Sequence, residues 1–355
     1  MVRINKQSRR RLFEENFSLR QPAALSRHFL NLGILILVGT AVSLYFYLLN
    51  QEERETRHSM MAAAHSAARI TASNKPFLLY GTAWKKERTA ELVSQAVHSG
   101  FRFIDTACQP KHYNEAGVGD GWKSAAEELK LQRSDFFLQT KYTPFGGQDP
   151  QNIPYDPDSP LDAQVKASLE VSLKNLQSSY LDSLVLHSPL NDFEDTMTVW
   201  QTMESFVDDG KVLRLGISNC YDFETFQNLY QKARIKPSVL QNRFYEDSNF
   251  DTELRAFCKN HSIWYQSFWT LTANRHALAT TDAKTLAEQK GLSPQTLLYA
   301  FLMSLGYGTP LSGTTNLGHM VEDVAVMERM QAGEVFFEDE TELRDFAKIL
   351  GMPDL

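Results

Sequence analysis

Three ionisable residues stand where stretches typical of buried β-strands end. Asp105 ends the run FRFID, Lys141 ends FFLQTK and His187 ends LDSLVLH, and loop-like sequence follows each of them. A carboxylate, an ammonium and an imidazole held together can balance charge and move protons. If these strands are parallel neighbours, their carboxyl ends bring the three groups into one pocket. The phenol of Tyr113, in the loop after Asp105, would join them.

Strand-like and helix-like stretches alternate from Pro76 onward, which is the pattern of a parallel sheet with helical connections. The predicted strands are at 77–82, 102–106, 135–141, 182–187, 212–218, 238–243, 263–268 and 309–312. Helical periodicity lies between them at 87–99, 115–129, 161–178, 193–208, 222–233, 250–260, 293–305 and 317–330. The region is close to the ~250 residues typical of a (β/α)8 TIM barrel, an α/β fold that we predict for residues 76–355 as one domain.

The N-terminal part differs in composition from the body. Residues 1–28 form a basic tail, and no Lys, Arg, Asp or Glu occurs between Arg27 and Glu52. We predict a transmembrane helix at 29–50, in contact with membrane lipid, and a linker at 51–75. A signal peptide is the main alternative, but its apolar region is usually shorter. Because basic flanks stay cytoplasmic, the tail predicts a single-pass type II protein. A barrel that faces the cytosol is the other topology.

The charge of the body excludes some partners and its cysteines suggest no metal. The whole chain has a net charge of −7 although its first 28 residues are basic, so the remainder is acidic, and we expect no nucleic-acid partner. Cys108, Cys220 and Cys258 are odd in number and widely spaced, without metal-ligand spacing. We predict buried or neutral thiols and no metal site. The sequence carries no signal for an oligomeric state.

Five segments, in the same order, resemble signatures of the aldo-keto reductase family: GFRFIDTA, YNEAGVG, YLDSLVLHSP, GKVLRLGISN and LQNRFY. Lys141 lies in the expected place between the second and the third. Similar segments run from residue 78 to residue 323, nearly the whole body. The resemblance implies an oxidoreductase with a barrel fold that reduces small carbonyl compounds, aldehydes or ketones, with NADPH or NADH.

The resemblance also implies a catalytic tetrad of Asp105, Tyr113, Lys141 and His187. Carbonyl reduction needs a hydride for the carbon and a proton for the oxygen, on which negative charge develops. Tyr113 would donate that proton, and Lys141 is expected to lower the pKa of the phenol. Asp105 would keep the buried lysine charged, and His187 would orient the carbonyl oxygen.

Further family positions imply where a cofactor and a substrate would bind. The implied cofactor residues are Thr82, Ser218, Asn219, Gln241, Gln266, Ser267, Ser312, Gly313, Thr314, His319 and Asp323. The implied substrate-pocket residues are Trp84, His112 and Trp269.

The sequence departs from the family pattern in the tyrosine loop. The family tyrosine usually lies five residues after the aspartate, where this chain has Pro110. The inserted segment CQPKH lengthens the loop, so Tyr113 must reach the pocket by another path. Counting back from Asn114 instead puts His112 at the tyrosine position. We predict Tyr113 as the proton donor and keep His112 as the alternative, which would give a much lower pH optimum.

Other departures concern the cofactor. Leu311 and His319 stand where many relatives have the cations that hold the 2′-phosphate of NADPH, so NADPH is only slightly favoured over NADH. Gln266 replaces the tyrosine that usually stacks on the nicotinamide. The glycines of YNEAGVGDG imitate a dinucleotide fingerprint, but their spacing is wrong and no strand leads into them.

Two functions remain after this reading. The first is a membrane-anchored NAD(P)H-dependent reductase of aldehydes or ketones. The second is a catalytically silent, nucleotide-binding accessory subunit of a membrane complex, which the displaced tyrosine and the missing phosphate ligands keep open.

Overall fold

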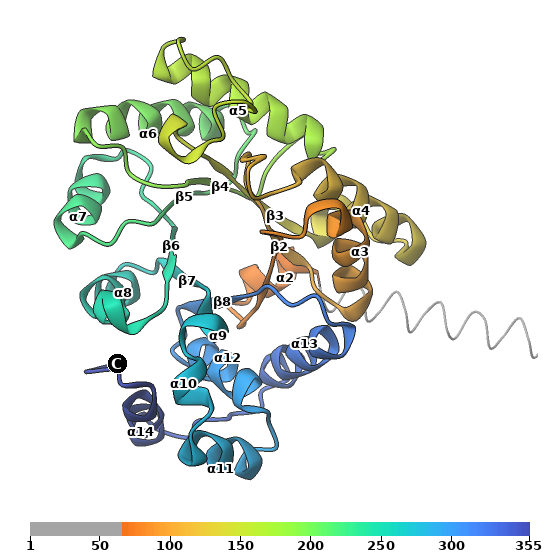
Figure 1. Ribbon diagram of the computed structural model, residues 1–355, viewed down its shortest axis with the longest axis vertical. Helices are drawn as coiled ribbons and strands as arrows, with labels where there is room; N and C mark the ends of the chain where they lie inside the picture. Colours follow the sequence, from red (N-terminus) through yellow and green to blue (C-terminus); the bar gives the residue numbers. More distant parts are fainter. Residues whose placement is uncertain (1–65) are drawn as a thin grey trace, which may run out of the picture. The chain divides into compact units, whose positions relative to one another are not determined.

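Eight parallel strands close into a barrel in the computed structural model, which describes residues 66–355 (Figure 1). The strands pair in chain order, and β1 returns to pair with β8. Their bounds are β1 Leu79–Gly81, β2 Phe103–Asp105, β3 Phe137–Tyr142, β4 Ser183–Leu186, β5 Leu215–Ser218, β6 Val239–Arg243, β7 Trp264–Phe268 and β8 Gly308–Ser312. The predicted TIM barrel and all eight predicted strands are therefore confirmed, although most observed strands are shorter.

Helices surround the barrel, and most of them connect one strand to the next (Figure 1). The α-helices are α2 Ala67–Ala72, α3 Thr89–Ser99, α4 Glu115–Leu129, α5 Leu161–Asn175, α6 Phe193–Asp208, α7 Phe223–Lys232, α8 Thr252–Asn260, α9 Thr270–Ala273, α10 Arg275–Leu278, α11 Thr281–Gln289, α12 Pro294–Ser304, α13 Leu317–Gln331 and α14 Glu340–Leu350. Short 3-10 helices are η1 Lys86–Arg88, η2 Arg133–Asp135, η3 Phe145–Gly147 and η4 Glu246–Asp251. The eight predicted helices are present, whereas α2, α9, α10, α11 and α14 were not predicted.

The two ends of the barrel differ in chemistry. Aromatic rings fill the end at which the strands begin: Phe77 stacks on Phe103 with centroids 4.0 Å apart, and Trp264 meets Phe77 edge-on at 5.1 Å. Phe137, the first residue of β3, packs against the same rings. This plug is buried apart from the half-buried Trp264. Polar side chains are therefore left to the opposite end, where the strands finish.

Part of the predicted linker belongs to the barrel body. Residues 67–72 form α2, in which Ala67 and Ile70 are buried in the main core. The ammonium of Lys75 donates to the Gln331 carbonyl, and the Gln331 side chain donates to the Pro76 carbonyl. Apolar burial and these two bonds tie the segment before Pro76 to α13 and its neighbours. The boundary predicted at Pro76 is therefore too late in the chain.

The predicted tail at 1–28 and membrane span at 29–50 lie outside the described residues, as does most of the linker. Within residues 66–355, no helix combines the length and the apolar character needed to cross a membrane. All three cysteines are free and buried, and burial raises the pKa of each thiol, as predicted.

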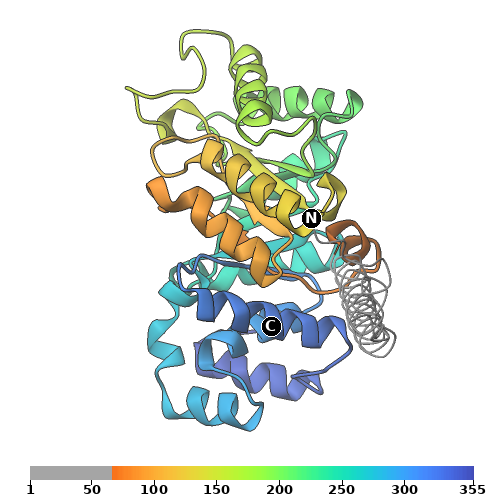
Figure 2. The same ribbon diagram turned by 90° about the vertical axis from the view of Figure 1, so that its right-hand side faces the viewer.

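The glycines of α4 serve helix packing. A side chain at Gly121 would meet the Ala90 backbone of α3, and one at Gly119 would overlap the Asn175 carbonyl at the end of α5. Figures 1 and 2 show α3 and α4 lying side by side. The glycines let three helices approach closely, which explains their presence without a dinucleotide.

Candidate active site

Asp105 and Lys141 form a buried ion pair at the carboxyl ends of β2 and β3. The Lys141 ammonium donates to both Asp105 carboxylate oxygens, at 2.8 and 2.7 Å, and to the Thr106 carbonyl at 2.8 Å. These three bonds use all three ammonium donors. Burial lowers the pKa of Lys141, and the Asp105 carboxylate opposes that effect. The prediction that Asp105 is the counter-ion of Lys141 agrees with this geometry.

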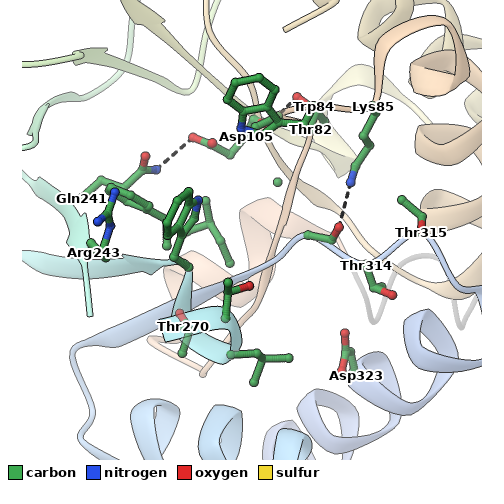
Figure 3. A pocket seen from close by; sticks show the side chains of 18 of the residues that line it. Thr82, Trp84, Lys85, Asp105, Gln241, Arg243, Thr270, Thr314, Thr315 and Asp323 are labelled. Atoms are coloured by element: carbon green, nitrogen blue, oxygen red, sulfur yellow. Dashed lines mark hydrogen bonds between the residues drawn. The ribbon is translucent and has the colours of Figure 1, made fainter. Parts of the chain in front are cut away.

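A network of amides supports the carboxylate from the other side of the barrel. Gln139 and Gln241 each donate to Asp105 Oδ1, at 2.8 and 2.9 Å, and each also donates to the Gln266 side-chain oxygen. Figure 3 shows the bond between Gln241 and Asp105. All three amides are buried. The network fixes the carboxylate that holds Lys141 in place.

Tyr113 reaches the pocket because the longer loop folds into a turn. The Gln109 carbonyl accepts the backbone N–H groups of both His112 and Tyr113, at 3.1 and 3.0 Å. The Lys141 ammonium lies 5.4 Å from the Tyr113 ring centroid, and the His187 ring lies 6.1 Å away. The Tyr113 hydroxyl has no hydrogen-bond partner within residues 66–355. The four tetrad residues are thus brought together.

The expected effect of Lys141 on the phenol is wrong in this structure. Burial, and then the Asp105 charge, raise the pKa of Tyr113 above its ordinary value. The main reason is burial of the phenol, and Lys141 gives all its hydrogen-bond donors to Asp105 and Thr106 rather than to the Tyr113 oxygen. Tyr113 therefore stays protonated, as a proton donor must.

His187 is held as a neutral ring. Its Nδ1 lies 2.6 Å from the Thr143 hydroxyl. The residue directly follows β4, and its carbonyl accepts a hydrogen bond from the Asn219 side chain. Burial, the charge of Lys141 and the nearby His112 lower the pKa of His187 well below its ordinary value. If Thr143 donates to Nδ1, the other ring nitrogen carries the proton and can act as a donor at the cavity that His187 lines.

His112 turns toward Trp84. The centroids of the two rings lie 3.8 Å apart, and the backbone N–H of Trp84 donates to the His112 backbone carbonyl at 2.8 Å. Burial and the neighbouring Lys111 lower the pKa of His112. His112 lines the pocket but packs on an indole, whereas Tyr113 faces Lys141 and His187.

A cavity of about 870 Å³ opens above the tetrad, at the upper end of the range for small-molecule sites (Figure 3). Fourteen of the predicted site residues line it: Thr82, Trp84, Asp105, His112, Tyr113, His187, Ser218, Asn219, Gln241, Trp269, Gly313, Thr314, His319 and Asp323. Lys141 lies beneath the lining, paired with Asp105.

Three predicted cofactor residues do not line the cavity. Gln266 is buried in the amide network, so it cannot take the place of a ring stacked on the nicotinamide. Ser267 accepts a hydrogen bond from the Thr270 hydroxyl, and Ser312 donates to the Asp323 carboxylate at 2.7 Å. Both serines are buried and act through these neighbours.

Several pocket residues were missed by sequence reasoning. Lys85 is 5% exposed and its ammonium donates to the Gly313 carbonyl at 2.9 Å. Burial lowers the pKa of Lys85 to about 8. Arg243 lines the cavity two residues after Gln241 on β6. Arg243 is the last residue of β6, and Lys85 lies in the loop that follows β1. Nearness to a predicted strand end was the only sequence signal that could have identified these two residues.

The lining fits a dinucleotide in two places. At one end, both N–H donors of Gln241 are used within the protein, which leaves its side-chain oxygen to accept from a carboxamide. At the other end, the loop after β8 leads into α13, whose first turn carries His319 at the cavity. A loop after the eighth strand followed by a helix N-terminus is a common phosphate site in such barrels. Lys85 adds a cation there.

Comparisons with known proteins identify the family of the chain. The profile of the Aldo/keto reductase family matches residues 77–336. An uncharacterized oxidoreductase of Schizosaccharomyces pombe is 28% identical over 238 residues, which are 66% of this chain and 76% of that protein. Glyoxal reductase of Bacillus subtilis is 32% identical over 179 residues, which are 50% of this chain and only 56% of that enzyme.

Solved structures show the same fold. A Bombyx mori aldo-keto reductase, crystallised in complex with NADP, is similar with a TM-score of 0.63 at 20% identity, over 77% of this chain and 89% of that one. At this identity the similarity concerns the barrel alone. The profile covers most of the sequence and includes all four tetrad positions. The chain therefore belongs to the aldo/keto reductase family.

Proposed function

We propose that this protein reduces aldehydes or ketones with NADPH or NADH, and that Tyr113 donates the proton. The observation that carries the proposal is the Lys141–Asp105 pair beneath a cavity lined by the unpartnered Tyr113 hydroxyl and the neutral His187. Family membership supports carbonyl reduction as the reaction, and the names of the relatives point the same way.

Each side chain has a defined part in the reaction. A bound nicotinamide supplies the hydride. His187 donates a hydrogen bond to the carbonyl oxygen and orients it, and a neutral ring can do so without adding charge. As negative charge develops on that oxygen, Tyr113 transfers its hydroxyl proton to it. Asp105 and Lys141 remain paired at the bottom of the cavity, next to the phenol of Tyr113.

The cofactor would lie between the Gln241 end and the α13 end of the cavity. Asn219 and Gln241 are placed to orient the carboxamide, and Lys85, Thr314 and His319 are placed near the phosphates. Asp323 and its Ser312 partner close the far end. With a histidine and a lysine as the cations, NADPH is slightly favoured over NADH.

Side-by-side kinetics of two variants test the proton donor. Full-length protein should oxidise NADPH with glyoxal or simple aromatic aldehydes. Tyr113→Phe should lose about 100-fold or more of kcat, because a positioned acid contributes 10² to 10⁴, and should still bind NADPH. His112→Ala, the matched control in the same loop, should retain turnover. Loss of turnover in His112→Ala but not in Tyr113→Phe would make His112 the donor. Nucleotide binding without any turnover by the wild type would favour the accessory subunit.

We also propose that residues 29–50 anchor the enzyme in a membrane with the basic tail on the cytoplasmic side. The support is the uncharged length of the segment and the basic residues before it. In sealed microsomes, added protease should leave the barrel intact until detergent is present. Digestion of the barrel without detergent would place it in the cytosol instead, and recovery in the soluble fraction would refute the anchor.

A further inference from the structure

Arg243 is a pocket cation that has no counter-ion. Its guanidinium makes no ion pair and no hydrogen bond within residues 66–355, and its Nε is buried without a partner. A guanidinium has five N–H donors and cannot lose its charge in a protein. A buried donor without an acceptor is destabilising, and residues 66–355 offer the guanidinium none.

Aromatic rings, rather than an anionic side chain, surround the Arg243 guanidinium. Its central carbon lies 4.1 Å from the Trp269 ring centroid, 5.0 Å from that of Tyr245 and 6.0 Å from that of Phe268. The Trp269 backbone adopts a left-handed conformation, with φ of 54°, which few residues other than glycine favour. Stacking occupies the faces of the guanidinium and leaves its edge free for a carboxylate or phosphate.

The position of Arg243 relates it to the reacting carbonyl. Gln241 and Arg243 are two residues apart on β6, so their side chains leave the strand on the same face, about 6 to 7 Å apart along it. Gln241 reaches Asp105 and marks the level of the tetrad. In Figure 3, Arg243 lies beside Gln241, whereas Lys85, Thr314 and Thr315 lie across the pocket.

From this geometry we infer that Arg243 binds an anionic group, a carboxylate or a phosphate, at the end of the substrate remote from its carbonyl. The inference rests on the proposed reductase function and names its substrate class: oxo acids and their phosphate analogues are reduced in preference to neutral carbonyl compounds of the same shape. The aromatic rings pack against the carbon skeleton between the two groups.

A pair of matched aldehydes tests the substrate class. 4-Carboxybenzaldehyde carries the anion, and its methyl ester, methyl 4-formylbenzoate, has the same skeleton without charge. Full-length wild type should show a higher kcat/KM for the acid. In Arg243→Gln the ratio of kcat/KM, acid to ester, should fall about 10- to 100-fold, as expected for the loss of a charge-assisted bidentate pair. An unchanged ratio would overturn the inference.

Two further variants guard against trivial explanations. Arg214→Gln removes a guanidinium that also stacks on aromatic rings, but at the opposite end of the barrel, and should keep the wild-type ratio. Arg243→Glu should reverse the preference and favour an aldehyde that carries a trimethylammonium group over 4-carboxybenzaldehyde. If Arg243→Gln instead weakens NADPH binding and leaves the ratio intact, the guanidinium serves the cofactor and the inference is wrong.

A binding measurement separates this inference from the reductase proposal. Benzoate, which cannot be reduced, should quench tryptophan fluorescence of the wild type through Trp269, and it should bind Arg243→Gln at least about tenfold more weakly. Arg243-dependent benzoate binding without turnover of any aldehyde would leave the anion site standing and refute the reductase. Equal binding by both proteins would refute the anion site.

Discussion

At the level of single residues, the site depends on how each buried charge is balanced. Lys141 gives all its donors to Asp105 and Thr106, so the two charges of the pair are each held by a partner. Tyr113 and His187, both next to this pair, remain uncharged: burial raises the pKa of the phenol and lowers that of the imidazole. Lys85 and Arg243 are cations on the cavity wall that make no ion pair within residues 66–355.

The charge of Lys85 predicts a pH dependence of cofactor binding. Burial lowers the pKa of Lys85 to about 8, so the ammonium is charged below that pH and becomes neutral above it. The phosphates of NADPH favour the charged form. The dissociation constant for NADPH should therefore rise by about tenfold between pH 7 and pH 9.5.

Fluorescence titration of NADPH checks this expectation with two variants. Lys85→Met should bind NADPH more weakly at pH 7 and lose the pH dependence. Lys85→Arg should bind well at both pH values, because a guanidinium stays charged. If Lys85→Met keeps the slope of the wild type, another group is responsible.

At the level of elements, the catalytic strand ends are positioned by helices that pack without intervening side chains. Gly119 and Gly121 let α4 lie directly against α3 and α5. Because α4 begins at Glu115, just after Tyr113, its placement sets where the loop with the phenol ends. The Asn114 side chain caps α4 by accepting from the Gly117 N–H at 3.0 Å.

Gly119→Ala should test this packing. The added methyl group would overlap the Asn175 carbonyl, a backbone atom that cannot turn away, so the free energy of unfolding should fall by about 2 to 3 kcal/mol. Urea denaturation measures the change. Gly146→Ala in η3, where a methyl group would meet no atom within 4 Å, is the control and should be nearly neutral. Similar losses in both variants would contradict the packing argument.

At the level of the whole molecule, the apolar packing that stabilises the barrel and the polar cavity lie at opposite ends. The aromatic plug of Phe77, Phe103, Phe137 and Trp264 closes one end, and the polar cavity occupies the other. The segment α2 extends the core beyond the first strand through Ala67 and Ile70. The described barrel therefore includes residues that precede the family match, which begins at residue 77.

Two chain lengths test the contribution of α2. The free energy of unfolding should be about 2 kcal/mol higher for a chain that begins at residue 62 than for one that begins at residue 76. The main reason is that the shorter chain lacks Ile70, which is buried in the longer one. Ile70→Ala in the longer chain should reproduce most of this loss. Ala68→Ser, on the exposed face of α2, should not. Equal stability of the two chains would show that α2 is dispensable.

The amino-acid sequence by itself determined the barrel and the three polar residues at the carboxyl ends of its strands. Strand and helix periodicity are local properties, and a polar residue that ends an apolar run can be recognised within a few positions, as for Asp105, Lys141 and His187. The same logic failed for α9, α10 and α11, because these helices are only four to nine residues long. Helices this short show little periodicity.

Only the tertiary structure decided which side chains share an environment. That the Tyr113 ring, and not the His112 ring, lies near Lys141 and His187 depends on a turn around Gln109 and on the indole of Trp84, in the loop after β1. The amide network joins Asp105 to Gln241 across 136 positions. Whether a lysine or an arginine has a counter-ion is likewise a matter of distance in space, and no local pattern encodes it.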